Sequence, residues 1–304
     1  VDHRDLHSFP TRRASDLESA KPIRVDISNP AAFYRMHQTI ELNLPGRLAV
    51  MDGLSARILT SQSYRDSHDR DKLLFQTDIA PGETLRFYLL KTAELAAVPP
   101  PIVKTFARYV PERHDDFAWE SDRIAHRLFG PALETWQAEP LTSSGVDVWI
   151  KRTRDLMINE MYRTQDFFNP TNVTQDDFKV GKTRGDGGLG IWQDGKLYVS
   201  HNWHSWKIIT TGPIRSEFEL TYQAWDAGGR RISETKRISI DAGSNLSRDE
   251  STFNSDDKSP LQIGVGLGER PGENVVVAAD SPVIDSWTSS PAKGLVVQDQ
   301  GEGW

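Results

Sequence analysis

Short hydrophobic runs with alternating polar positions recur along the chain from Ile23 onward, separated by turn residues. Runs of about four to eight residues with this alternation are typical of β-strands, and clusters of Asn, Asp, Gly and Pro are typical of the turns between them. On this pattern we expect strands at 23–27, 36–44, 47–51, 73–78, 84–90, 103–109, 123–129, 146–149, 196–200, 208–210, 215–225, 231–240, 262–266 and 274–279.

Helical segments are few. We predict a helix over 152–162 and a single helical turn over 92–97. The segment 241–259, rich in Ser, Asp and Asn, is expected to be a long loop or a hairpin tip. Many short strands with few helices favour a sandwich or a barrel, so the predicted fold class is all-β.

Composition narrows the classes of partner. The chain has 304 residues, a net charge of −7 and no long run of Lys or Arg, which argues against nucleic acid or an anionic membrane. It has no cysteine, which excludes disulfides, thiol catalysis and Cys-based zinc sites. No apolar run approaches the roughly 18 residues of a membrane helix. We expect no metal and no cofactor.

The two ends of the chain look unlike the rest. The segment 8–17 resembles the translation of a sequencing adapter, so residues 1–17 are set aside as a non-native segment. The chain stops abruptly at 301–304, which reads as the start of an element. We therefore expect a single β-sandwich domain over 18–304 that is truncated at both ends, with any signal peptide lost.

The segment 108–131 holds six Arg or His residues, five carboxylates and four aromatics. Guanidinium groups match carboxylates or sulfates, and aromatic rings match sugar faces, so an acidic carbohydrate is one interpretation. An ion-paired loop entering a strand is the other. Strand alternation places Arg123 and Arg127 on one face, about 13 Å apart, and His126 on the apolar face as a core histidine. The candidate sugar-binding residues here are Arg123, Arg127, Trp119 and Glu120.

Two later segments also carry candidates. In 215–225, Arg215 and Glu217 project from the polar face of a strand, which is either exposed or the floor of a cleft. In 201–206, two histidines alternate with two tryptophans, so His201 and His204 are candidates for acid–base chemistry, for sugar contact with Trp203, or for zinc with a third ligand.

The Gly-rich segment 182–190 lacks the order of a phosphate-binding P-loop. Its glycines are expected to let the backbone approach a ligand or another strand closely. Lys182 and Arg184 are included among the candidate substrate-binding residues.

Four motifs, at 108–131, 145–151, 180–188 and 212–222, occur in an order that resembles the bacterial domain-of-unknown-function family 4861. The resemblance implies a galactose-mutarotase-like β-supersandwich with few short helices and a sugar cleft. It also implies a periplasmic or secreted protein of loci that degrade ulvan or rhamnogalacturonan, with a dehydratase acting on a terminal uronic acid.

Two positions depart from the family pattern. Relatives carry a loop with Tyr and His where this chain has 164–177 without histidine, and they carry Cys or Ala at Asp186. If the absent histidine is the family's base, this chain is altered in substrate or inactive.

The predicted reaction is dehydration or β-elimination at a terminal uronate. Removing the proton alpha to the carboxylate places a second negative charge there, which preorganised cations must neutralise. An acid must also protonate the departing hydroxyl. The candidates are Arg123, Arg127 and Arg215 as cations, His201 and His204 as base, and Tyr162 and Tyr109 as acid.

Two other functions stay open. A glycoside hydrolase would use two carboxylates, for instance Glu120 or Asp116 with Glu217. A non-catalytic carbohydrate-binding protein would need only the arginines and tryptophans. The expected partner in each case is an acidic oligosaccharide or polysaccharide.

Overall fold

The computed structural model describes residues 22–92, 100–138, 140–165, 173–176, 180–257 and 259–268. The adapter-like segment 1–17, the expected strand at 274–279 and the chain end lie outside these residues, as does most of the expected turn at 92–97. Within the described part, strands dominate and pair antiparallel in several sheets. The prediction of an all-β, sandwich-like fold is confirmed. No helix among the described residues is long and apolar enough to cross a membrane.

The chain divides into two compact units. The sequence analysis predicted a single domain over 18–304 and did not separate these units. The first unit comprises residues up to Ser63 together with Asp71–Pro101. The second comprises Tyr64–Arg70 and the residues from Ile102 onward.

The first unit consists of two small sheets around an apolar core. That core is formed by Val50, Leu73, Phe75, Phe87 and Leu89. One sheet has the order β1(Ile23–Ser28)-β7(Thr84–Lys91)-β3(Leu48–Asp52)-β4(Ile58–Leu59), and the other has the order β2(Arg35–Leu42)-β6(Asp71–Ile79)-β5(Ser61–Arg65).

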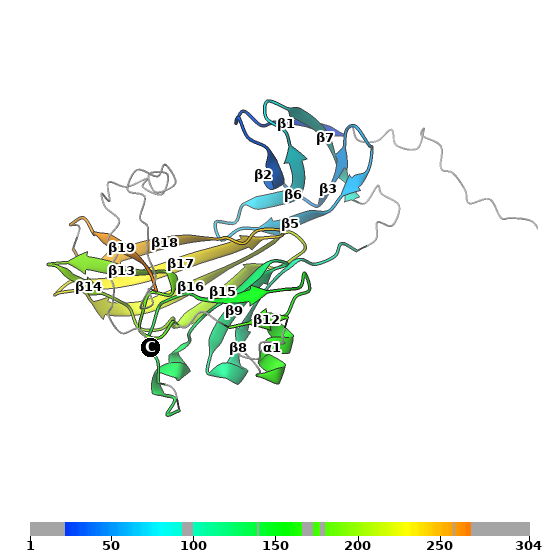
Figure 1. Ribbon diagram of the computed structural model, residues 1–304. Coiled ribbons are helices and arrows are strands. Elements are labelled where there is room, and N and C mark those ends of the chain that lie inside the picture. Colours follow the sequence, from blue (N-terminus) through cyan, green and yellow to red (C-terminus); the bar gives the residue numbers. More distant parts are fainter. Residues whose placement is uncertain are drawn as a thin grey trace, which may run out of the picture. The chain divides into compact units, whose positions relative to one another are not determined.

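The second unit holds three sheets and the helix α1(Ile158–Thr164) (Figure 1). The sheets are β12(Thr174–Gln175)-β11(Asp147–Lys151)-β10(Ile124–Leu128)-β9(Asp116–Ser121)-β8(Thr105–Val110), then β15(Ser205–Thr210)-β16(Arg215–Asp226)-β17(Arg231–Asp241)-β18(Ser247–Ser255), and finally β14(Lys196–Tyr198)-β13(Asp186–Gln193)-β19(Ile263–Leu267).

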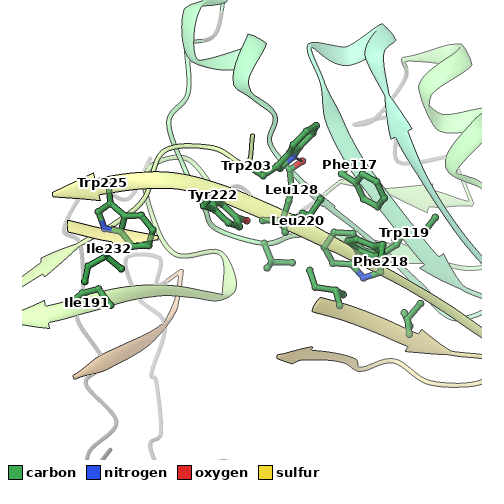
Figure 2. Packing of buried hydrophobic residues seen from close by; sticks show 14 of the residues in the cluster. Phe117, Trp119, Leu128, Ile191, Trp203, Phe218, Leu220, Tyr222, Trp225 and Ile232 are labelled. Atoms are coloured by element: carbon green, nitrogen blue, oxygen red, sulfur yellow. Dashed lines mark hydrogen bonds between the residues drawn. The ribbon is translucent and has the colours of Figure 1, made fainter. Parts of the chain in front are cut away.

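The five-stranded sheet buries both of its faces. Alternation along β9 sends Phe117 and Trp119 toward Phe218 of β16, whereas Ala118 faces the other side. The first face belongs to a large apolar cluster that continues along β16 through Leu220 and beyond (Figure 2). The second face packs against α1, where Ala125 and Trp149 meet Ile158, Met161 and Tyr162.

The structure corrects two predicted elements. The segment expected as a loop over 241–259 contains β18, which pairs with β17 along nine residues. Its inward positions are mostly Ser and Asp, so the alternation had no hydrophobic signature. The predicted helix over 152–162 begins only at Ile158, because the strand β11 runs to Lys151 and the chain then turns.

Candidate active site

The α1 face of the five-stranded sheet carries a buried group of charged residues at one end. Arg127 on β10 donates from Nε to Asp147 Oδ2 at 2.6 Å and from Nη2 to Asp176 Oδ2 at 2.8 Å. Its Nη1 lies 3.4 Å from Asp116 Oδ2. The four side chains are all nearly inaccessible to solvent. One guanidinium therefore faces three carboxylates, an arrangement that we call the Arg127 cluster.

A tyrosine and a second arginine complete the Arg127 cluster. The Tyr162 hydroxyl, on α1, donates to Asp116 Oδ2 at 3.0 Å. The guanidinium carbon of Arg108 lies 5.5 Å from the centre of the Tyr162 ring, and that of Arg127 lies 5.3 Å from the Trp149 ring. Such cation–π contacts are strongest where the cation has lost its water. The Tyr162 ring is thereby held with its hydroxyl on Asp116.

The three carboxyl groups lie close together and out of contact with solvent, so their pKa values are raised toward neutral pH. Burial raises the pKa of Asp116 to about 6, although the attraction of Arg127 opposes the shift. Burial raises the pKa of Asp176 to about 7, and it also raises the pKa of Asp147. Burial and the charge of Asp116 keep the pKa of Tyr162 well above its ordinary value. Carboxyls with pKa values near neutrality are able to accept and donate protons at physiological pH.

The buried Asp116 Oδ1 has no hydrogen-bond partner among the described residues. Leaving a buried carboxylate oxygen unpaired is costly, and a protonated carboxyl would lower that cost. This orphaned oxygen agrees with the raised pKa of Asp116. The described residues hold no group of three or more His, Cys, Asp or Glu side chains arranged to bind a metal ion.

Three residues of the 108–131 segment have structural roles in the protein interior. Trp119 is buried and stacks on His126 at 5.2 Å between ring centres. His126 is a core histidine, as predicted, and burial lowers its pKa to about 3. Glu120 is inaccessible, binds Lys151 at 2.6 Å and accepts from the backbone N–H groups that begin α1. Arg123 lies in the turn between β9 and β10, outside the strand that was expected to include it.

The histidines proposed as base lie on exposed surface. His201 Nδ1 is 3.1 Å from Glu134 Oε2, and the His201 side chain is 70% exposed. His204 contacts Gln223 at 3.1 Å. Trp203, between them in sequence, is buried and donates to the Leu128 carbonyl at 3.2 Å. His201, Trp203 and His204 are close in sequence, but each side chain contacts different residues.

The polar face of β16 forms its own ion-pair group. Arg215 donates from Nε and Nη2 to Asp241 at 2.6 and 2.9 Å. Glu217 is buried and accepts from the Tyr64 hydroxyl at 3.0 Å. His204 contacts the same strand at Gln223, eight residues from Arg215, which corresponds to about 26 Å of strand. One sugar residue cannot touch both ends.

The remaining candidates are also engaged within the protein. Arg184 is buried, donates to Ser144 Oγ at 2.9 Å, and has its pKa lowered to about 10 by burial. A second Arg184 nitrogen donates to the Lys182 carbonyl at 3.2 Å. A Cβ on Gly188 would lie 2.4 Å from the Arg184 carbonyl oxygen, so the Gly-rich segment packs backbone against backbone. The Tyr109 ring stacks on Trp206 at 5.5 Å.

The structure thus brings together Arg127 and Tyr162 of the predicted set, by way of Asp116. The histidines and Arg215 do not join them through any contact among the described residues. Asp147 and Asp176 are not among the residues predicted from the sequence, because their partner Arg127 lies 20 and 49 residues away in the chain. The sequence held one indication of this contact, because Asp147 belongs to a predicted strand, 146–149, and this strand pairs with β10.

Comparison with known proteins places the chain in a family. The profile described as Domain of unknown function (DUF4861) matches residues 27–299. The chain belongs to this family. It is also 35% identical over 252 residues to "Uncharacterized protein P7" of Formosa agariphila, an alignment that covers 79% of this chain. The chain spans 63% of the length of that relative. No solved structure matches this chain.

Proposed function

We propose that this DUF4861 protein is a carbohydrate-active enzyme that removes water from the terminal uronic acid of an oligosaccharide by β-elimination. The observation that carries the proposal is the Arg127 cluster, in which one guanidinium faces three buried carboxylates whose pKa values are raised. An excess of carboxylates at pKa values of about 6 and 7 is typical of sites that transfer protons.

The reaction needs a base and an acid. In the proposal Asp176, the least enclosed of the three carboxylates, is the one that a bound substrate reaches, and it takes the proton alpha to the uronate carboxylate. The released electron pair forms the carbon–carbon double bond, and the adjacent hydroxyl leaves. Tyr162, which like any tyrosine is protonated at neutral pH, donates the proton that turns this hydroxyl into water. These roles replace His201 and His204, because both histidines lie in other surroundings.

A glycoside hydrolase is the second candidate, because a retaining or inverting mechanism also needs two carboxyl groups with separated pKa values. The Arg127 cluster contains the required groups in Asp116, Asp147 and Asp176. The products differ, since hydrolysis yields a new reducing end and no double bond. A binding protein would yield neither product.

The test is incubation with oligosaccharides from ulvan, pectin and glycosaminoglycans that end in a saturated uronate. We expect an ultraviolet-absorbing conjugated alkene and one water lost by mass. Tyr162→Phe should slow its formation by about 10²–10⁴-fold, because the acid is gone. Tyr222→Phe is the matched control, since Tyr222 is also buried and its hydroxyl has no hydrogen-bond partner among the described residues. This variant should keep the wild-type rate.

Two results would contradict the proposal. New reducing ends without an alkene would favour hydrolysis. A correctly folded protein that leaves all three classes of oligosaccharide unchanged would favour a binding role.

A further inference from the structure

Arg184 differs from the other buried cations of the described part of the chain in what it contacts. Four buried cations each bind at least one carboxylate at 2.5 to 2.8 Å, namely Lys72, Arg127, Lys151 and Lys236. Arg184 is buried as well, with an exposed fraction of 3%. It forms no ion pair with a carboxylate among the described residues. Lysine and arginine are almost never fully buried unless they are paired, so this exception calls for a physical account.

The contacts of the Arg184 guanidinium within the described residues are with uncharged acceptors. Nη1 donates to Ser144 Oγ at 2.9 Å, and Nη2 donates to the Lys182 carbonyl at 3.2 Å. The buried Nε has no hydrogen-bond partner among the described residues. Asp186 is the nearest carboxylate along the chain, but its side chain is exposed and does not bind Arg184. The guanidinium has therefore left water without a carboxylate to offset its charge, which is strongly unfavourable.

Loss of the proton does not remove this charge. Burial lowers the pKa of Arg184 to about 10, which is still three pH units above neutrality. At pH 7 only about one molecule in a thousand would hold a neutral Arg184 side chain. The folded protein thus carries a positive charge in its interior under physiological conditions.

Three glycines enclose this arginine. A Cβ on Gly266 of β19 would lie 2.4 Å from Arg184 Cγ, and a Cβ on Gly188 would lie 2.4 Å from the Arg184 carbonyl oxygen. A Cβ on Gly145 would lie 2.8 Å from the Arg184 carbonyl carbon. Side chains at these positions would collide with Arg184, so glycine is needed for the close approach. The Gly-rich segment 182–190, which the proposed function does not use, therefore packs an arginine into the interior.

The enclosure limits the size of a ligand that could offset the charge. Because Arg184 is only 3% exposed, a sugar ring has no access to both edges of its guanidinium. A small ion needs far less room. The Ser144 hydroxyl accepts from Nη1, which leaves its own hydrogen to donate to such an ion. Nε–H is a second donor, on the same guanidinium.

We infer that Arg184 and Ser144 form a buried binding site for a small monovalent inorganic anion, which is chloride under physiological conditions. One chloride cancels the single uncompensated charge, whereas a divalent anion would leave an excess negative charge in the same surroundings. The site lies where the chain entering β11 meets the chain entering β13, at the bridge between Val146 and Gly185. The inference is independent of the proposed function, since neither residue belongs to the Arg127 cluster.

The first experiment follows the melting temperature at constant ionic strength while chloride replaces gluconate, an anion too large for the site. Wild type should gain stability along a saturable curve as chloride rises from about 1 mM to about 300 mM. Ser144→Ala keeps the guanidinium and loses one charge-assisted hydrogen bond, so the chloride concentration at half-saturation should rise by about tenfold or more. Arg184→Met removes the charge and should show no dependence on chloride. Arg248→Met is the matched control, because the Arg248 side chain is 71% exposed, and it should respond like wild type.

The second experiment locates the ion directly. Bromide substitutes for chloride and scatters X-rays anomalously, so wild-type crystals soaked in bromide should show a peak beside the Arg184 guanidinium. This readout and the Ser144→Ala curve decide the question even if Arg184→Met fails to fold. The inference is overturned if wild type shows no saturable chloride effect, if Arg184→Met or Ser144→Ala keeps the full effect, or if bromide occupies only exposed positions elsewhere.

Discussion

Arg127 and Arg113 act on the same carboxylates and differ in what surrounds their guanidinium groups. Arg127 is enclosed by three aspartates and two aromatic rings, whereas Arg113 lies on a half-buried indole. A guanidinium that already serves three carboxylates holds the charges of the cluster in place. The surroundings of each arginine, more than its residue type, define its role.

The pH dependence of stability should carry the signature of Asp116. Folding raises its pKa from an ordinary value near 4 to about 6, so the folded state binds the additional proton. The resulting stabilisation is complete below about pH 4 and is lost as pH rises through about 6, a change of roughly 3 kcal/mol. Asp116→Asn removes this titration. The free energy of unfolding of Asp116→Asn, measured in urea, should therefore increase relative to that of wild type as pH rises from 4 to 7. Parallel curves for the two proteins would contradict the assignment.

At the scale of elements, side chains decide where strands and helices end. The helix α1 begins where Glu120 accepts from the backbone N–H groups of Met157 and Ile158 at 2.8 Å each. The same carboxylate neutralises Lys151, which is fully buried at the end of β11. Glu120 comes from a different strand, so local sequence could not show where the helix starts. The apolar pattern of 152–162 correctly indicated that a helix exists.

Glu120 should be a stability residue of α1. Glu120→Gln leaves the buried ammonium of Lys151 without its carboxylate, which we expect to cost about 3–5 kcal/mol in the free energy of unfolding. Adding Lys151→Met removes the uncompensated charge, so the double variant should recover much of the loss. Urea unfolding followed by circular dichroism measures both effects. If the double variant is as unstable as the single one, the ion pair is not the cause.

Three of the strands that the sequence did not predict share a physical reason. The strand β9 lies in a segment dense in charge, β13 contains three glycines among its first five residues, and the inward positions of β18 are largely Ser and Asp. In these strands the stabilising interactions are backbone pairing and contacts to neighbouring strands, which residue pattern does not reveal. The strands with clean alternation, such as β16 and β17, were predicted to within one residue.

At the scale of the whole molecule, each compact unit builds apolar clusters from its own residues. Phe75 lies in the first unit's core and Phe218 in the second unit's largest core, and both side chains are fully buried. The presence of two cores explains why a chain of this length forms two compact units. Sandwich-type strands alone do not indicate how many cores a chain will build.

The two cores should respond separately to mutation. Phe75→Ala and Phe218→Ala should each cost about 3–5 kcal/mol of local stability, because each leaves a cavity in a packed core. Hydrogen exchange should accelerate in β3, β6 and β7 for the first variant and in β9, β10, β16 and β17 for the second. Equal acceleration in both units by either variant would show that they unfold as one.

The all-β class, most strand positions, the core role of His126 and the family resemblance were determined by the sequence itself, because they depend on local alternation and ordered motifs. The tertiary structure decided which charges meet. Arg127, Asp147, Tyr162 and Asp176 are separated along the chain and come together only through strand pairing and the packing of α1. Burial then shifted their protonation, and burial is a property of the folded chain alone.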